Sequence, residues 1–538
     1  MHHLSIKMWG VVLLFQFFHL LDHNLRTRNV IFLKKSNISI FEEGNTQIFD
    51  KYYSTKQIDE TTTDDWKMIS SEDNPYIIYV YSAYLDLRGF PEEESYGVRI
   101  NSLIHYESSL EIAQIIKCDL FSEKKYIGGI PHIVIHKEHH NKLFASSTIW
   151  CKPELKYNTS NKILKSITHV KIRMGSSLSS NSFKTSELIL VVHSLEMKDL
   201  FLFEASICIR PWWGEPTKTI YNGSESKEFD DITLLIEFFE VYRLLGINRI
   251  TMYNNYLPLG SAVSKIIQYY SNIAGFIEVV PYTLPLIPYK EVWDYAQISM
   301  IQDCLLRHTR KSKYVLFIDT DEYLLPTVPG IGLPSLFDMI LERKKFVGAI
   351  WVPMYLHFLE WPDDPRGVKI YPSFKVITKE LHLPLGKIFS FNLKSLQKTC
   401  RLAFAGTQKN KKSRRKIVVR PETIMYMGIH EPEKMLSNYS MIQMPIVDIR
   451  NNSCIHSCRI TASLHHYRRA MGVVSNNPKN REFQMLFNSN KCLFNENPKV
   501  SDGTIVDKTA WDILGAKLYK SVIKVIQDID YFESEQIL

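Results

Sequence analysis

Three acidic side chains stand within four residues of one another, at the point where an apolar segment ends. The stretch Lys313–Pro326 reads KYVLFIDTDEYLLP, so a β-branched and aromatic run stops at Asp319-Thr320-Asp321-Glu322. Carboxylates this close repel one another, and a bound divalent cation relieves that repulsion. Oxygen ligands suit Mg²⁺ or Mn²⁺, which can also neutralise a diphosphate leaving group. The alternative is a solvated acidic turn, which needs no ion.

The segments around these acids alternate between strand-like and helix-like periods. Strands are expected up to Ile209 and at 249–253, 276–280 and 314–319. Helices are expected at 232–245, 262–273 and 294–308, where apolar residues recur at i, i+3 and i+4, with Asp230 or Asp231 as the first N-cap. This alternation predicts an α/β fold, with a mainly parallel sheet and helices on both faces. The acids would then lie at a carboxyl strand end, where ligands bind.

The composition is that of a globular protein. Of 538 residues, 45% are hydrophobic and 23% are charged, and no solenoid period repeats. The 65 Lys and Arg residues exceed the 57 Asp and Glu residues by 8, and most of that excess lies in the run Lys409–Lys416. Such a run is typical of a solvated loop, so no nucleic-acid partner is expected. The oligomeric state stays open.

The segment Met8–Leu21 contains no Asp, Glu, Lys or Arg. As a helix it would reach only ~21 Å against a hydrocarbon core of ~30 Å, so Lys7 and Arg26 would have to snorkel. A cleaved signal peptide fits the length, although no small-x-small cleavage site follows Leu21. Either alternative places most of the chain in the secretory lumen. The expected location is a Golgi or other secretory-pathway membrane, in single-pass type II orientation.

Sequons and cysteines agree with a lumenal location. Asn-x-Ser/Thr sequons begin at Asn37, Asn158, Asn222, Asn438 and Asn451. The eight cysteines permit disulfides without fixing the pairs. Cys454 and Cys458 flank His456, but no second pair has the spacing of a zinc site, so a disulfide is favoured. Cys304 and His308 fall on the apolar face of a predicted helix and are expected in the core.

Changes in composition divide the chain into five expected segments. A signal anchor or signal peptide (1–25) and a polar stem (26–70) precede a smaller β-rich domain (71–200), the α/β domain (201–475) and a C-terminal helical extension (476–538). In the β-rich segment the apolar runs are short and alternating, as in YIIYVYSAYLDLRG and SELILVVHSL.

Several motifs, in this order and spacing, resemble family 92 glycosyltransferases, once called domain of unknown function 23. They are CIRPWWG (208–214), EFFEVYRLLGINRITMYNN (237–255), DCLLRHTRKSKYVLFIDTDEYLLP (303–326), KIVVRPETIMYMGIH (416–430) and HYR (466–468). The resemblance implies a GT-A fold and an inverting transfer from a nucleotide sugar. In characterised relatives the donor is UDP-galactose, with Mn²⁺. The acceptor it implies is a glycan, in animals the core fucose of N-glycans, and the β-rich block is expected as scaffold or acceptor surface.

The resemblance also assigns metal and nucleotide ligands. Asp319 and Asp321 are expected to bind the metal, with His430 or His466 as the third ligand, because GT-A enzymes often use a late histidine. A hydrogen-bonded structural role is the alternative for either histidine. The residues expected to bind the nucleotide sugar lie at strand ends or in late motifs and are Asn254, Asn255, Asp319, Arg420 and Arg468. Lys416 begins one of those motifs and is a further candidate to face the donor.

Inversion at the anomeric carbon requires a carboxylate that takes the acceptor hydroxyl's proton. GT-A enzymes usually place it beyond the strand that follows the D-x-D segment, here 348–358. The acids after that strand are Glu360, Asp363 and Asp364, of which Glu360 is favoured as the first off the strand. Trp361 is expected to offer an aromatic face to a sugar ring. The alternative is a surface turn made by Pro362 and Pro365, and this region departs from the glycine-containing segment of relatives.

Two other functions fit the same residues. A catalytically silent glycan-binding protein of this fold would not need the intact D-x-D motif. A metal-dependent phosphohydrolase would need further metal ligands at other strand ends, and none is identified in the sequence.

Overall fold

The computed structural model describes residues 66–535 apart from internal segments, the longest of which are 213–225, 378–387, 403–414 and 469–491. The segment Met8–Leu21, the stem and the sequons other than that of Asn438 lie outside the described residues. No helix in the described part of the chain is long and apolar enough to cross a membrane. The described residues belong to one compact unit, Asp64–Leu538, so the expected β-rich, α/β and C-terminal segments pack as one body.

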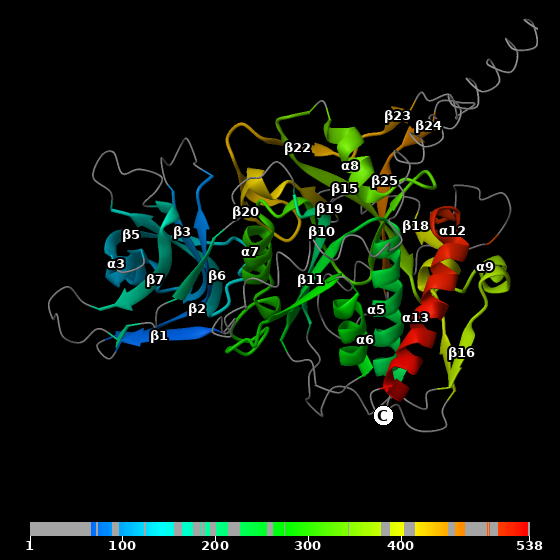
Figure 1. The fold of residues 1–538 in the computed structure, drawn as a ribbon, viewed down its shortest axis with the longest axis horizontal. Helices are drawn as coiled ribbons and strands as arrows, with labels where there is room; N and C mark the ends of the chain where they lie inside the picture. Colours follow the sequence, from blue (N-terminus) through cyan, green and yellow to red (C-terminus); the bar gives the residue numbers. More distant parts are fainter. Residues whose placement is uncertain are drawn as a thin grey trace, which may run out of the picture. The chain divides into compact units, whose positions relative to one another are not determined.

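The first sheet is built from short, alternating apolar segments. Its strands are β1 (Lys67–Ser71), β2 (Asn74–Asp86), β3 (Gly97–His105), β4 (Ile116–Ser122), β5 (Lys125–Ile135), β6 (Phe144–Pro153), β7 (Ile167–Met174), β8 (Lys184–Thr185) and β9 (Ile189–His193). The order is β1-β2-β3-β6-β5-β4-β7-β8, and β9 pairs with β2 and β7. The sheet is drawn in blue to cyan in Figure 1. The helix α3 (Ser109–Ile115) follows β3, and a disulfide joins Cys118 on β4 to Cys151 on β6.

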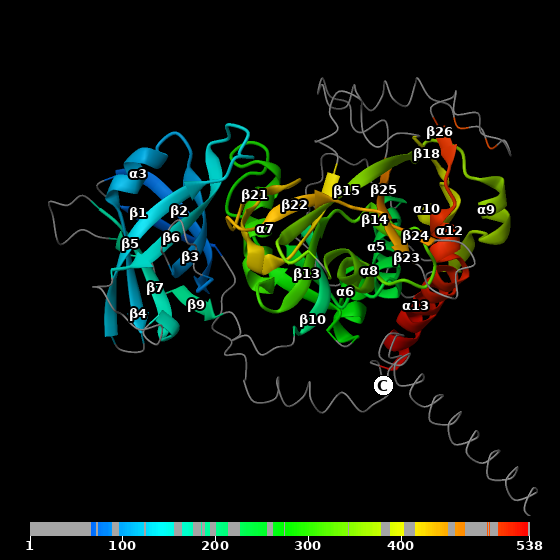
Figure 2. The same cartoon turned by 90° about the horizontal axis from the view of Figure 1, so that it is seen from above.

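The second sheet is mixed, and most of its described strand pairs are parallel, with three antiparallel pairs among them. Its strands are β10 (Phe203–Trp212), β11 (Arg249–Asn254), β12 (Ile277–Pro281), β13 (Ser312–Ile318), β14 (Glu322–Pro326), β15 (Val347–Phe358), β19 (Arg415–Val419), β22 (Ser440–Gln443) and β25 (Ala462–Arg468). The strands β12-β11-β10-β13 are parallel, as expected. Beyond them β19 is antiparallel to both of its neighbours, β13 and β15. The strand β14 is antiparallel to β25, beside which it lies in Figure 2.

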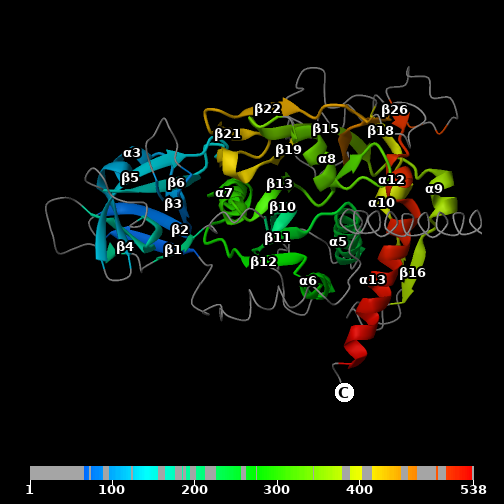
Figure 3. The same cartoon turned by 45° about the horizontal axis from the view of Figure 1, so that its top comes forward.

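Helices cover both faces of the second sheet. They are α5 (Ser226–Leu244), α6 (Ala262–Asn272), α7 (Gln297–His308), α8 (Leu333–Leu341), α12 (Thr509–Ile513) and α13 (Gly515–Glu535). Inward residues of β10 such as Ile207 pack with α5, α6, α8 and α13 in one core. Cys208, next along the strand, belongs to another core with α7 and with Leu103 and Phe144 of the first sheet. Figure 3 shows α7 between the strands of the first sheet and β10. Successive side chains of β10 point to opposite faces of the sheet, and both faces are buried. Each face is therefore covered by its own layer of helices.

Short elements complete the described structure. They are β16 (Phe374–Ile377), β17 (Ile388–Phe391), β18 (Cys400–Leu402), β20 (Ile424–Met427), β21 (Pro432–Met435), β23 (Val447–Ile449), β24 (Cys458–Ile460), β26 (Thr504–Val506), α9 (Pro365–Ile370) and α10 (Lys394–Gln397). The pairing of β26 with β18 and a disulfide between Cys400 and Cys492 attach the C-terminal part to the rest.

The strands predicted at 249–253, 276–280 and 314–319 are confirmed within two residues. Two helix predictions were wrong in detail. The helix α5 begins at Ser226, so neither Asp230 nor Asp231 caps it. The stretch 294–308 is a short 3₁₀ turn, Asp294–Ala296, followed by α7, because Tyr295 and Ala296 adopt left-handed backbone angles.

A buried ion-pair group connects the first sheet to the segment that follows β19. Asp86 on β2 accepts from Arg88 and pairs with Arg99, both at 2.8 Å. Arg88 donates to the carbonyls of Pro421 and Ile424, each at 2.7 Å, and Arg99 donates to the Met425 carbonyl. These bonds satisfy backbone groups of the segment that follows β19, so the β-rich sheet holds that segment in place.

Candidate functional site

The acids of the D-x-D segment lie where β13 ends, and a lysine from the neighbouring strand reaches them. Lys416 on β19 places Nζ 3.0 Å from Asp319 Oδ2 and 3.2 Å from Glu322 Oε2. The backbone N–H of Asp319 donates to the same Glu322 oxygen at 2.9 Å. A buried ammonium group therefore neutralises part of the repulsion that the sequence suggested a metal would relieve.

Burial and charge act against each other on these groups. Burial raises the pKa of Asp319, but Lys416 and then Arg210 lower it, and the net pKa lies below its usual range. The pKa of Glu322 is raised, because burial outweighs the effect of Lys416. The cluster therefore combines an ionised Asp319 with a Glu322 that is harder to ionise.

The second acid of the motif pairs with a histidine. His466 on β25 places Nε2 3.2 Å from Asp321 Oδ2, and its Nδ1 lies 3.7 Å from Glu322 Oε1. Burial lowers the pKa of His466, but Asp321 and Glu322 raise it above its usual value. The arrangement follows from the strands, since Glu322 on β14 is directly opposite His466 on β25.

An arginine on the central strand completes the charged surroundings. Ile209 on β10 is paired with Ile318 on β13, so Arg210 and Asp319 follow side by side at the same sheet edge. Arg210 Nη2 donates to Asp294 Oδ1 at 2.8 Å. Burial lowers the pKa of Arg210, but Asp294 and then Asp319 raise it above its usual value.

The side chains at this edge fit a divalent cation that also binds substrate oxygens. Oδ1 of Asp319 is buried and has no hydrogen-bond partner among the described residues. Asp321 and His466 add an oxygen and a nitrogen ligand 3.2 Å apart. Mg²⁺ and Mn²⁺ are often held by one or two carboxylates plus substrate phosphates, so this partial ligand set is chemically sufficient.

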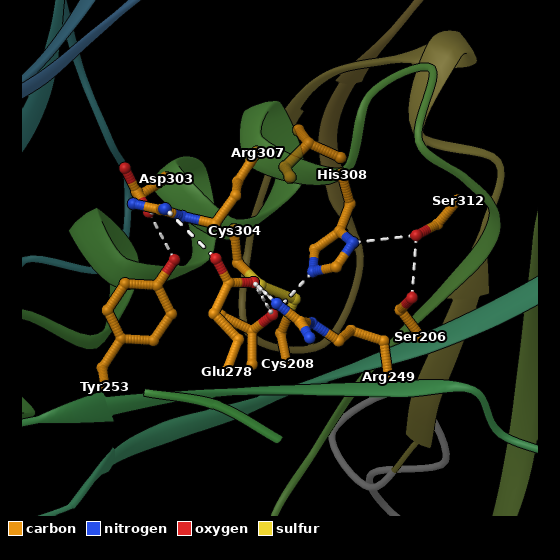
Figure 4. Close-up of a disulfide and its surroundings, with 12 residues drawn as sticks. Ser206, Cys208, Arg249, Tyr253, Glu278, Asp303, Cys304, Arg307, His308 and Ser312 are labelled. Carbon is orange, nitrogen blue, oxygen red and sulfur yellow. Dashed lines mark hydrogen bonds and ion pairs between the residues drawn. A yellow bond between two sulfur atoms is a disulfide. The ribbon is translucent and has the colours of Figure 1, made fainter. Parts of the chain in front are cut away.

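Another group of ligand-type side chains is not a metal site. Ligand atoms of Cys208, Cys304 and His308 come within 4.8 Å of one another. The two cysteines form a disulfide between β10 and α7, and His308 hydrogen-bonds Thr251 and Ser312 through its two ring nitrogens (Figure 4). The expectation that Cys304 and His308 are core residues is confirmed.

Two of the expected ligands lie elsewhere. Arg420 was expected at the diphosphate, but β19 runs antiparallel to β13, which puts Arg420 at the opposite edge of the sheet from Asp319. There it donates to the carbonyls of Lys345 and Val347 at 3.2 and 3.3 Å. His430 lies beside the start of β19, with Nδ1 3.2 Å from the Arg415 carbonyl, and it is His466 that reaches Asp321.

The asparagines expected at the nucleotide lie at the carboxyl edge of β11. Asn254 pairs with Trp212 of β10 and is half-buried. Asn255 is buried, and its Oδ1 accepts from the Leu284 backbone at 2.9 Å, so the side chain holds the chain after β12. Arg468 ends β25 two residues after His466, and its charge lowers the pKa of both Asp321 and His466.

The three candidate bases lie in different environments. Glu360 is exposed in the turn after β15. Asp363 is exposed and pairs with Lys398 at 2.8 Å. Asp364 is fully buried, caps α9 through the Arg366 backbone and accepts from Thr399 at 2.7 Å, so its oxygens already have structural partners. These partners favour a structural role for Asp364 over the predicted role as base.

Trp361 was expected to offer an open face to a sugar and does not. It is only 4% exposed and packs edge-to-face against Phe358. Trp361 is buried because the chain turns after β15 and places its ring in a small apolar core.

The sequence of the domain matches a known family. The sequence model of Glycosyltransferase family 92 covers residues 226–490. Residues 226–490 are thus similar to family 92 glycosyltransferases and are called the family 92 domain. A Caenorhabditis elegans protein, beta-1,4-galactosyltransferase galt-1, is 27% identical over 247 residues, which are 45% of this chain and 46% of that protein. The chain thus spans about half the length of this curated relative.

A solved structure is also similar. The crystal structure of GalNAc-T7 with UDP, GalNAc and Mn²⁺ has 11% sequence identity, with 66% of this chain and 61% of that chain covered. The TM-score is 0.22, which is too low to support an argument about the fold.

The family 92 domain contains Asp319, Asp321 and His466, but Arg210 lies before it and received no predicted role. The motif CIRPWWG contains this arginine, and its place two residues after a buried strand cysteine was the available signal. Asp294 was missed because the contact with Arg210 depends on a left-handed turn that periodicity does not reveal.

Proposed function

We propose that this protein is an inverting glycosyltransferase of GT-A type that moves a sugar, galactose from UDP-galactose, onto a glycan acceptor. The main support is the group formed by Asp319, Asp321, Lys416 and His466 at the carboxyl edge of β13. The family 92 match and the galactosyltransferase name of the C. elegans relative favour glycosyl transfer and the galactosyl donor. The acceptor proposed from the resemblance is the core fucose of N-glycans.

The chain's own side chains would act mainly on the donor diphosphate. Asp321, His466 and Oδ1 of Asp319 would hold Mn²⁺ or Mg²⁺, which when bound neutralises charge on the leaving diphosphate. Arg210 and Arg468 stand beside the acids and would bind phosphate oxygens. Lys416 holds Asp319 Oδ2 and thereby directs the other carboxylate oxygen away from β19. Preorganised charge of this kind stabilises a transition state without reorganisation.

The catalytic base would be an exposed carboxylate on the acceptor side. Glu360 remains the preferred residue and Asp363 the second, because both are exposed whereas Asp364 is committed to the cap of α9.

The location proposed for the protein is a Golgi or other secretory membrane. A single N-terminal segment would anchor it with the catalytic domain in the lumen.

The test is release of UDP and transfer of labelled galactose from UDP-galactose, with and without N-glycan acceptors, in Mn²⁺ and in excess chelator. We expect transfer to require donor, acceptor and metal. Asp319→Asn and Asp321→Asn should each lower transfer by orders of magnitude. Glu111→Gln, at an exposed acid of α3 with no proposed role, serves as the control for removal of a charge.

Other outcomes identify the alternative functions. Acceptor-independent release of UDP at the same rate would indicate a hydrolase. Glycan binding without any turnover would indicate a silent glycan-binding protein. Full transfer in excess chelator would contradict the metal assignment.

A further inference from the structure

Two loops with strained backbone meet near Arg210. One connects β5 to β6 in the β-rich sheet, and the other connects β12 to α7. The structure describes seven non-glycine residues with positive φ, and six of them lie in these loops: His140, Asn141, Tyr289, Asp294, Tyr295 and Ala296. Residues in this region of backbone space are held there by their surroundings, and they gather at ligand-binding sites.

The loops are bonded to each other. The Phe144 backbone N–H donates to the Glu291 carbonyl at 2.8 Å, and Phe144 forms a parallel bridge with Val292. The His140 and Trp293 rings lie 4.0 Å apart between centroids. Lys142 Nζ is 6.0 Å from the Trp293 ring centroid. Residues of the β-rich sheet and of the family 92 domain therefore both contribute to the region where the two loops meet.

Aromatic side chains with polar edges gather where the two loops meet. The Tyr106 and His139 rings lie 3.9 Å apart between centroids in a tilted arrangement, and Tyr289 meets Trp293 edge-on at 5.7 Å. Tyr289 is 44% exposed, His140 is exposed and the other rings are half-buried. We call this set the aromatic surface; its members are Tyr106, His139, His140, Tyr289 and Trp293. Each ring offers an apolar face together with a polar edge, which is the combination that a sugar ring with its C–H face and hydroxyls requires.

The aromatic surface is continuous with the acid cluster. Tyr289 donates its hydroxyl to Asp294 Oδ1 at 2.7 Å. The same oxygen accepts from Arg210, which stands beside Asp319 at the carboxyl edge of the sheet. A sugar on the aromatic surface would thus lie next to the place proposed for the donor.

We propose that the aromatic surface binds the glycan acceptor and that the β-rich sheet is part of the acceptor site. The proposal rests on the proposed function, since it supplies the acceptor platform that the buried Trp361 does not. A glycan is favoured over a polypeptide because the surface is made of rings with polar edges rather than of aliphatic side chains or an unpaired strand edge.

The test measures binding without any donor. Purified full-length wild-type protein and variants are applied to an immobilised array of core-fucosylated and non-fucosylated N-glycans. The variants are Trp293→Ala and Tyr106→Ala, one from each side of the junction, with Trp293→Phe as the conservative change. Tyr126→Ala is the matched control, because Tyr126 is a 62% exposed aromatic on the β-rich sheet away from the surface defined here.

We expect the two alanine variants to lower the apparent glycan affinity about tenfold or more, while Trp293→Phe keeps most of it and Tyr126→Ala all of it. Thermal melting identifies any variant that fails to fold, in which case the other alanine variant decides. Unchanged affinity in the folded alanine variants would overturn the proposal. So would a wild-type protein that binds no glycan, or one whose binding to a glycoprotein survives removal of the glycan. Failure of the proposed function would appear separately, as a lack of UDP-galactose turnover by wild type.

Discussion

Lys416 reaches across from β19 to Asp319, with 3.0 Å between Nζ and Oδ2. Its side chain is almost fully buried, and Glu322 is its second partner. The ammonium group of Lys416 therefore offsets part of the negative charge of the D-x-D segment even without a bound ligand.

Replacement of Lys416 by methionine should therefore damage both stability and nucleotide binding. Loss of one partner of a buried ion pair costs about 3–5 kcal/mol, because Asp319 and Glu322 are left uncompensated. We expect a lower melting temperature and weaker UDP binding by calorimetry. Arg420→Ala is the matched control, since Arg420 directly follows the same strand and lies at the opposite sheet edge from Asp319. Equal UDP affinity in wild type and Lys416→Met would contradict the role given to Lys416.

Replacement of His466 by glutamine should weaken metal binding. His466 is the nitrogen ligand nearest to Asp321, so we expect the affinity for Mn²⁺ in the presence of UDP to fall about tenfold or more. Electron paramagnetic resonance of free Mn²⁺ measures this without an assay of transfer. His430→Gln should leave the affinity unchanged, because His430 lies beside Arg415. A larger effect from His430→Gln would reverse the assignment.

The acids after β15 should separate into structural and chemical roles. Asp364→Ala removes the cap of α9 and leaves the Thr399 hydroxyl without its acceptor, so we expect a loss of about 1–3 kcal/mol of stability. Glu360→Gln should leave the melting temperature and UDP binding unchanged and lower turnover strongly. Denaturant melts and steady-state assays on the two variants check this. Near wild-type turnover in Glu360→Gln and in Asp363→Asn would show that the base lies elsewhere.

His308 should make the fold sensitive to acid. Burial lowers its pKa to about 3, with Glu278 opposing, whereas an unfolded histidine titrates near ~6.5. The folded state therefore binds fewer protons, so this contribution to stability is present above pH ~6.5 and is lost as pH falls toward 3. The slope from this group approaches ~1.4 kcal/mol per pH unit.

Melting curves between pH 7 and 4 measure that slope. His308→Gln should melt at a lower temperature at pH 7 but show a shallower dependence on pH than wild type. His357 and His465, whose pKa values burial also lowers, remain in both proteins and so cancel in the comparison. Parallel curves for the two proteins would show that His308 does not titrate during unfolding.

The parallel half of the second sheet was predictable because its patterns are local. Each of β11, β12 and β13 is an apolar run that follows a helix-period segment. The position of β19 was not predictable, since the sequence does not reveal that it lies antiparallel between β13 and β15. That direction decides whether Lys416 or Arg420 meets Asp319, and the two residues are only four positions apart.

The acids and His466 could be named as candidates because a D-x-D motif after a strand and a late histidine are visible in the sequence. The partners of these residues were not, because Arg210 and Asp294 meet only through tertiary packing and a left-handed turn. Asp364 and Trp361 were assigned to the acceptor side since their residue types suit it. Their burial, which excludes it, depends on how the chain turns after β15.

The central strand β10 has a practical consequence for anyone who dissects this protein. It lies between β11 and β13, yet it precedes residues 226–490, the range that the family's sequence model covers. The helix α13, which packs on α5, follows that range. A fragment cut at the borders of similarity would lose the middle of its own sheet, one half of the Cys208–Cys304 disulfide and the cover of α5. The range matched by the family model is thus smaller than the compact unit Asp64–Leu538. Expression boundaries are better placed ahead of β1 and after α13.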